Sequence, residues 1–91
     1  MIYRIKLLDA AEFDLVRLAK NEPKAFRKAQ TLIEELKTHP KTGTGHPEPL
    51  KGDRAGQWSR RITNKHRLVY EIQETQVIVL VLTAYGHYED K

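Results

Sequence analysis

Cysteine is absent from this chain of 91 residues, so it can form neither disulfides nor a thiolate metal site. A protein without disulfides suits a reducing compartment, and we expect a cytoplasmic location. Long apolar runs are also missing, because the longest covers only residues 77–82, whereas a membrane-spanning helix needs about 20 apolar residues. Arg4 and Lys6 interrupt the first residues before any signal-peptide pattern develops. We therefore expect a soluble, unprocessed protein that does not enter a membrane.

Metal and nucleotide motifs are missing too. The chain has no HExxH or DxD spacing, and no glycine pattern of the P-loop or dinucleotide-binding type. We therefore expect neither a metal nor a cofactor. Of the histidines, His39 and His46 are expected to be exposed bystanders, and His66 to be a hydrogen-bonded histidine on the packed side of a strand.

The charge of the chain is unbalanced. Lysine and arginine total 16 against 12 aspartate and glutamate residues, which gives a net charge of +4. Such an excess favours a polyanionic partner such as nucleic acid, but a solvated basic surface explains it equally well. Because two domains of this total length could not each bury a sufficient core, we expect one domain spanning residues 1–91.

The N-terminal half has the pattern of a strand followed by two helices. Residues 2–7 alternate between apolar and polar side chains, as in a half-buried strand. One helix is predicted from Asp9, as its N-cap, to Asn21, and a second begins at Pro23 and stops before Pro40. On the first helix, helical spacing predicts a buried face of Phe13, Val16 and Ala19, flanked by Leu15 and Leu18.

The C-terminal half has the pattern of a sheet. Residues 40–56 hold three of the four prolines and four of the five glycines, and predict an ordered loop without regular structure. Strand patterns follow at 57–63, 66–72 and 77–85 and predict an antiparallel meander. The last pattern is apolar on successive residues, which is typical of a central strand covered on both faces. The whole order predicts an α+β fold in which a helical hairpin covers one face of the sheet.

Strand parity predicts a basic site on the opposite face of that sheet. Side chains alternate between the two faces of a strand. If the apolar residues Leu68 and Tyr70 pack under the helices, Arg61 and Arg67 point together toward the open face. Two guanidinium groups placed side by side form a site of the size of a phosphate.

Cleavage of RNA without a metal needs a base for the 2′-hydroxyl proton, an acid for the departing 5′-oxygen, and cations for the charge of the phosphorane. Glu48 lies between two prolines, whose fixed φ angles would hold a carboxylate on a stiff loop, and it is the candidate base. His87 follows Gly86 after the last strand pattern and is the candidate acid. Tyr88 could stack on a base or contact a phosphate, or simply pack against the sheet. Taken alone, Glu48 and His87 have simpler interpretations, a surface glutamate in a proline turn and an exposed histidine in a chain tail.

Four motifs occur in order along the C-terminal half: Gly45-His46-Pro47-Glu48-Pro49-Leu50-Lys51, Trp58-Ser59-Arg60-Arg61-Ile62, His66-Arg67-Leu68-Val69-Tyr70 and His87-Tyr88. In this order and spacing they resemble the YoeB (Txe) family of toxins in the RelE superfamily. The resemblance covers nearly the whole chain and implies a compact, microbial-ribonuclease-like fold. The chain departs from the family pattern where Tyr85 and Gly86 stand in place of an arginine and an aromatic residue.

The resemblance also implies a function. Such a protein is the toxin of a type II toxin–antitoxin system and cleaves mRNA in the ribosomal A site, which blocks translation. Its partners are an antitoxin, the ribosome and mRNA, and members often form homodimers. The implied roles are general base for Glu48, general acid for His87, stabiliser of the scissile phosphate for Arg67, a companion role for Tyr88, and supporting cations for Arg61 and Lys51.

Two other functions stay open at this point. A toxin of the same fold that inhibits a protein target such as gyrase would need neither Glu48 nor His87, since one fold can host different functions. A non-catalytic RNA-binding module on the ribosome would rely on phosphate contacts, and its binding would be strongly salt-sensitive. The combination of an acid, a base and paired arginines at the family's spacing favours the endoribonuclease.

Overall fold

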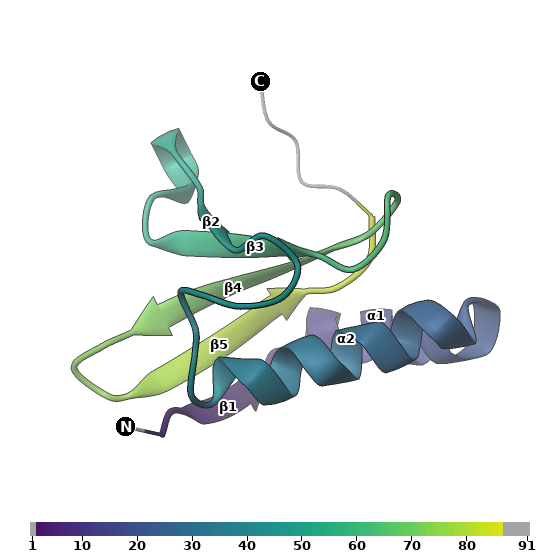
Figure 1. The fold of residues 1–91 in the computed structure, drawn as a ribbon, viewed down its shortest axis with the longest axis horizontal. Helices are drawn as coiled ribbons and strands as arrows, with labels where there is room; N and C mark the ends of the chain where they lie inside the picture. Colours follow the sequence, from purple (N-terminus) through teal and green to yellow (C-terminus); the bar gives the residue numbers. More distant parts are fainter. Residues whose placement is uncertain (1, 87–91) are drawn as a thin grey trace.

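The computed structural model describes residues 2–86, and His87 and Tyr88 lie outside this range. The chain begins with strand β1 and two helices and ends with a run of strands (Figure 1). The elements are β1 (Arg4–Leu7), α1 (Asp9–Asn21), α2 (Pro23–Leu36), β2 (Glu48–Pro49), the short 3-10 helix η1 (Gly52–Arg54), β3 (Gln57–Arg61), β4 (Arg67–Gln73) and β5 (Ile78–Thr83).

The strands form one five-stranded sheet in the order β1-β5-β4-β3-β2. Strands β2 to β5 pair antiparallel, and β1 pairs parallel with β5, so the sheet is mixed. The predicted α+β fold, with an N-terminal strand, a helical hairpin and a meander, is therefore confirmed. The expectation that residues 40–56 lack regular structure is wrong at two places: Glu48 and Pro49 pair with Ser59 and Trp58 of β3, and Gly52–Arg54 form η1.

Helix α1 turns a different face to the core than its apolar residues predict. Phe13 and Val16 are exposed, at 64% and 53%, whereas Asp14 is buried. The carboxylate of Asp14 accepts a hydrogen bond from the backbone N–H of Ala84 at 3.0 Å, just beyond β5. A polar group can be buried when it is hydrogen-bonded, so Asp14 shares the buried face of the helix with Ala11 and Leu18. Asp9 is also not the N-cap, since Leu8 holds that position and Asp9 is the first helical residue.

Helix α2 forms as its sequence predicts, with Pro23 at the first position, where no backbone donor is lost. Both helices lie along one face of the sheet (Figure 1). They cover the fully buried residues Leu68, Tyr70, Val79 and Val81. Strand β5 is central, between β1 and β4, but it is not covered on both faces as expected. Its alternate residues, which face away from the helices, are only half-buried.

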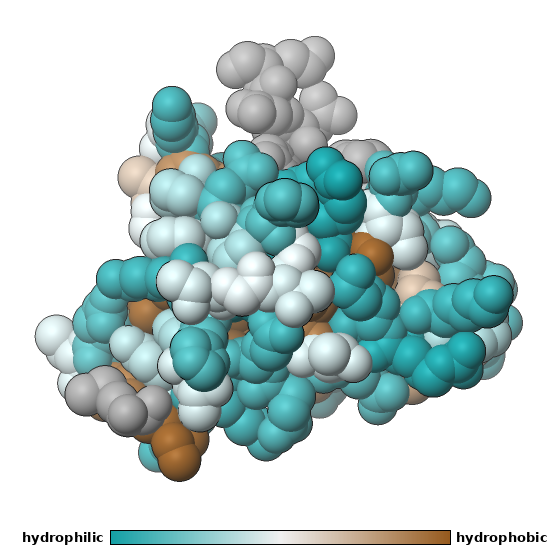
Figure 2. Space-filling view, viewed as in Figure 1, coloured by the Kyte–Doolittle hydropathy of each residue, from teal (hydrophilic) through white to brown (hydrophobic). Residues whose placement is uncertain are grey.

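Most of the molecular face seen in Figure 2 is covered by hydrophilic residues. Between residues 2 and 86, no helix has both the length and the apolar character needed to cross a membrane.

Candidate active site

The pairing of β2, β3 and β4 brings four polar residues to the face of the sheet away from the helices. Three of them, Glu48, Arg61 and Arg67, were predicted from the sequence, and the fourth is Ser59. Glu48 stands opposite Ser59, and Arg61 stands opposite Arg67. Directly opposed residues of antiparallel strands point to the same side of a sheet. Leu68 and its alternate neighbours face the helices, so Arg67 must face the other way. The structure thus places Arg61 and Arg67 on one open face, as their parity predicts.

The guanidinium group of Arg67 is the centre of this cluster. Its Nη2 donates to Oε1 of Glu48 at 3.0 Å, and its Nε and Nη2 donate to Oγ of Ser59 at 3.3 and 3.2 Å. The side chain of Arg67 is 14% exposed and that of Glu48 is 53% exposed. The cation is therefore held in place by its contacts, while the carboxylate beside it stays open to solvent and to a ligand.

Ser59 is the contact that sequence reasoning missed. It is fully buried and supports Arg67 from the neighbouring strand. The signal was available, because Ser59 has the same strand parity as Arg61 and lies two residues before it. A hydroxyl at that position has no apolar role, and an arginine on the adjacent strand is within reach of it diagonally.

Arg61 and Lys51, the two predicted supporting cations, lie toward opposite ends of β3. Arg61 is the last residue of β3. Lys51 lies near the first residue of β3, because its neighbour Leu50 donates a backbone hydrogen bond to Gln57. Both side chains are exposed. An extended polyanion that crosses this face could contact one cation before Glu48 and the other after it.

The last described residue, Gly86, lies next to the start of β4. The backbone N–H of Arg67 donates to the carbonyl of Gly86 at 2.9 Å, and the N–H of Gly86 donates to Nδ1 of His66 at 2.8 Å. His66 is buried and hydrogen-bonded, as predicted. His87 and Tyr88 continue the chain from this point, outside the described residues.

A hollow on the open face extends from this region across β3, β4 and β5. Its position coincides with a register shift between β4 and β5 at Val69 and Tyr70. Such irregularities occur next to active sites, where they change the direction of a side chain. The hollow is lined by Arg54, Gln57, Val69, Leu82, Thr83, Tyr85 and Gly86.

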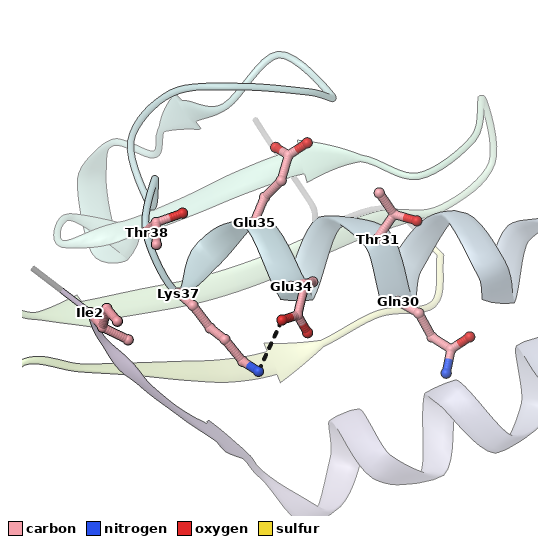
Figure 3. A pocket seen from close by; sticks show the side chains of 7 residues that line it. All are labelled: Ile2, Gln30, Thr31, Glu34, Glu35, Lys37 and Thr38. Carbon is pink, nitrogen blue, oxygen red and sulfur yellow. Dashed lines mark hydrogen bonds and ion pairs between the residues drawn. The ribbon is translucent and has the colours of Figure 1, made fainter.

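A second hollow lies beside the C-terminal half of α2, near Ile2 (Figure 3). Within it Lys37 donates to Glu34 at 3.1 Å. None of the predicted site residues lines it, and it adjoins the β1 edge of the sheet, whereas Glu48 lies in β2 at the other edge. It is therefore not part of the candidate active site.

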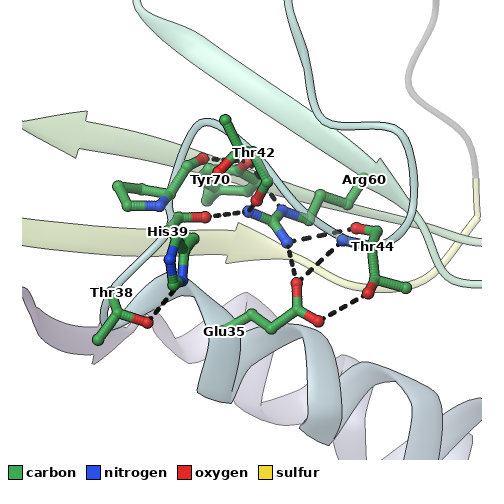
Figure 4. A network of polar contacts seen from close by, with 8 residues as sticks. Glu35, Thr38, His39, Thr42, Thr44, Arg60 and Tyr70 are labelled. Carbon is green, nitrogen blue, oxygen red and sulfur yellow. Dashed lines mark hydrogen bonds and ion pairs between the residues drawn. The ribbon is translucent and has the colours of Figure 1, made fainter.

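Arg60, the neighbour of Ser59, is fully buried on the helix side and organises the loop that leads to Glu48 (Figure 4). Its guanidinium group donates to Glu35 of α2 at 2.8 Å and to the hydroxyl of Tyr70 at 3.2 Å. It also donates to the carbonyl oxygens of His39, Thr42 and Thr44. Because three loop carbonyls share one cation, the loop is fixed to β3 and α2 at the same time.

The groups around Arg60 have shifted pKa values. Glu35 accepts hydrogen bonds from the Thr44 hydroxyl at 2.7 Å and from its backbone N–H at 3.0 Å. The Thr44 hydroxyl bond, with further help from Arg60, holds the pKa of Glu35 below its ordinary value. Burial raises the pKa of Tyr70, whose hydroxyl donates to the carbonyl of Pro40 at 2.7 Å. The alternation of side chains along β3 puts Arg60 on the opposite face from Arg61, but it does not identify the partners of Arg60.

In the part of the chain that the structure describes, no group of three or more histidine, aspartate or glutamate residues is placed to hold a metal ion. The chemistry that the open face itself offers is that of a half-exposed carboxylate beside a fixed guanidinium. Such a pair can accept a proton and stabilise the negative charge of a phosphoryl group at neighbouring positions.

Comparison with known proteins gives consistent matches. Residues 9–88 match the model of the YoeB-like toxins of bacterial type II toxin–antitoxin systems. A Toxin YoeB from Streptomyces coelicolor is 42% identical over 67 residues, which is 74% of this chain and 80% of that protein.

Solved structures of similar proteins show the same fold. A YoeB/ParE toxin from Agrobacterium tumefaciens superposes with a TM-score of 0.87 at 35% identity, covering 93% of this chain and 99% of that one. A YoeB dimer and a YoeB–YefM complex from Staphylococcus aureus superpose with TM-scores of 0.81 and 0.80 at 28% identity, each covering 97% of this chain and 100% of the other.

Proposed function

Since this chain belongs to the family of YoeB-like toxins of bacterial type II toxin–antitoxin systems, we propose that it is a ribosome-dependent endoribonuclease that cleaves mRNA in the A site and inhibits translation. The observation that carries this proposal is the contact between Glu48 and Arg67 on the open face of the sheet. A surface glutamate in a proline turn would need no such partner. A carboxylate and a cation 3.0 Å apart can instead act on adjacent atoms of one phosphodiester.

In the proposed mechanism Glu48 removes the proton of the 2′-hydroxyl, and the 2′-oxygen attacks the adjacent phosphorus. Arg67 neutralises the charge that develops on the phosphorane, and Ser59 keeps its guanidinium in place. The bond to the 5′-oxygen then breaks, and His87 protonates the leaving oxygen. The products are a 2′,3′-cyclic phosphate and a 5′-hydroxyl end, and the step requires no metal and no cofactor.

The other predicted residues bind the substrate in this proposal. Arg61 and Lys51 contact phosphates on the two sides of Glu48, and Tyr88 stacks on a base next to the cut. The Staphylococcus aureus structures show a YoeB dimer and a YoeB–YefM complex. We propose that this chain likewise binds a cognate antitoxin and forms a homodimer.

The test is cleavage of mRNA on programmed ribosomes, with the cut and its end groups mapped for the wild type, Glu48→Gln and His87→Ala. A 2′,3′-cyclic end made only by the wild type supports the proposed acid–base nuclease, because a metal-activated water would leave a different end. Glu48→Gln keeps the shape and the hydrogen bond to Arg67, so it isolates proton removal. Intact mRNA with all three proteins would favour a toxin that inhibits a protein target or a non-catalytic ribosome binder.

A further inference from the structure

His66 is buried just before β4, with an exposed fraction of 3%, and its side chain contacts two separate parts of the chain. Its Nε2 lies 2.6 Å from Oε2 of Glu22, at the junction of the two helices. Its Nδ1 lies 2.8 Å from the backbone nitrogen of Gly86. Its ring lies 4.3 Å, centroid to centroid, from that of Tyr85. One side chain therefore joins the helical hairpin to the end of the described chain.

The contacts of His66 determine its tautomer. A backbone N–H can only donate, so Nδ1 of His66 must accept the bond from Gly86 and carries no proton. The ring proton therefore lies on Nε2, where it is donated to the carboxylate of Glu22. Glu22 is thus the partner that keeps Nδ1 available as an acceptor.

Gly86 is held through both of its backbone groups. Its N–H is bonded to His66, and its carbonyl accepts from the N–H of Arg67. It has a φ of +76°, in the left-handed region that favours glycine. These two bonds hold the backbone of Gly86, the residue that precedes the proposed general acid in the sequence.

We propose that His66 is a positioning residue for the cleavage reaction, which acts by holding Gly86, the residue that precedes the proposed general acid His87. This inference rests on the proposed endoribonuclease function. His66 touches no reacting atom, because its ring is buried between Glu22, Tyr85 and Gly86. The backbone N–H of its neighbour Arg67 binds the carbonyl of Gly86, and the side chain of Arg67 binds Glu48, so the start of β4 contacts both the proposed base and the residue before the proposed acid.

Two variants separate the two hydrogen bonds of His66. In His66→Asn the side-chain oxygen can take the position of Nδ1 and accept from Gly86, while the bond to Glu22 is lost. In His66→Gln the longer amide reaches the position of Nε2 and can donate to Glu22, while the acceptor for Gly86 is lost. The two variants are matched in chemistry and differ in which contact they keep.

The readout uses two mRNA substrates on programmed ribosomes, one ordinary and one with sulfur in place of the bridging 5′-oxygen at the cut. A thiolate leaves without being protonated, so the sulfur substrate does not need a general acid. We expect His66→Gln to lower kcat on the ordinary substrate by about 10- to 100-fold and to come within about threefold of the wild type on the sulfur substrate. His66→Asn should stay within about threefold of the wild type on both.

The controls separate the possible failures. His87→Ala should show the same rescue by sulfur, and ribosome binding by each variant checks that it folds. If His66→Gln lowers kcat equally on both substrates, the role of His66 is merely structural. If His66→Gln and His66→Asn lower kcat equally, the bond to Gly86 is not the cause of the loss. Both results overturn the inference while the nuclease stands. A wild type that cleaves neither substrate overturns the proposed function itself, and the inference with it.

Discussion

The side chain of Arg67 contacts both the candidate base Glu48 and the supporting Ser59. Both contacts involve the planar guanidinium group, which presents several donors in a fixed geometry. The strict alternation of side chains in β3 and β4 made the facing of Arg67 predictable from sequence. The contact with Glu48 was not predictable in the same way, because it depends on β2, a two-residue strand inside a segment rich in proline and glycine.

Replacement of Arg67 by alanine tests its proposed role in the transition state. We expect Arg67→Ala to lower kcat for mRNA cleavage by about 100-fold or more, because the charge on the phosphorane is then left without its cation. Ribosome binding, measured by co-sedimentation, should change by only a few fold. Arg61→Ala is the matched control, since Arg61 lies opposite on the same face but is exposed, and its loss should weaken binding more than kcat. Parallel losses of binding and cleavage in Arg67→Ala would contradict the assignment.

At the level of elements, helix α2 was well predicted and the face of α1 was not. Helix α2 has one apolar stripe and a proline at its first position, so local pattern and tertiary packing agree. Helix α1 has apolar residues on more than one side. Its buried face contains Ala11, Leu18 and also Asp14, whose carboxylate accepts from the N–H of Ala84, 70 residues away in the sequence. A rule based on neighbouring residues has no access to such a partner.

The stability of α1 provides a second prediction. We expect Asp14→Ala to lower the free energy of unfolding by about 1–3 kcal/mol, because the N–H of Ala84 would be left buried without an acceptor. Phe13→Ala, on the neighbouring residue of the same helix, should change it by no more than about 0.5 kcal/mol, because Phe13 is 64% exposed. Urea unfolding of both variants checks this. A larger loss of stability in Phe13→Ala than in Asp14→Ala would instead support the buried face that the apolar pattern predicts.

For the whole molecule, the dependence of stability on pH should reflect Glu35. Its pKa is lower in the folded chain than its ordinary value, chiefly because of the Thr44 hydroxyl. The ionised carboxylate therefore stabilises the fold fully above the ordinary pKa of a glutamate, and this contribution is lost as the pH falls through the lower, folded pKa. We expect Glu35→Gln to flatten the decline in the free energy of unfolding below about pH 5.

Denaturant titrations at a series of pH values measure this decline. The matched control is Glu34→Gln, which removes the same charge from the adjacent residue, where the carboxylate is exposed and pairs with Lys37. That variant should keep the slope of the wild type. Equal slopes for the wild type and Glu35→Gln would show that another group controls the acid sensitivity.

The pairing of the whole sheet was only partly visible in the sequence. The meander of β3, β4 and β5 follows from adjacent strand patterns with short turns, which pair with their neighbours. The parallel pairing of β1 with β5 joins strands that are separated in the sequence by α1, α2 and three other strands. The residues of β1 contain no pattern from which β5 could be identified as its partner.

That parallel pair has a consequence for the synthesis of the chain. Strand β1 is the first of the described strands to be translated, but within residues 2–86 it pairs only with β5, the last of those strands to be made. The nascent polypeptide therefore cannot complete its sheet until residues 78–83 have left the ribosome, because contacts of large sequence separation form only when both segments are present. The helical hairpin and strands β2 to β4 can therefore form earlier, but the two ends of the described chain are joined only once β5 is available.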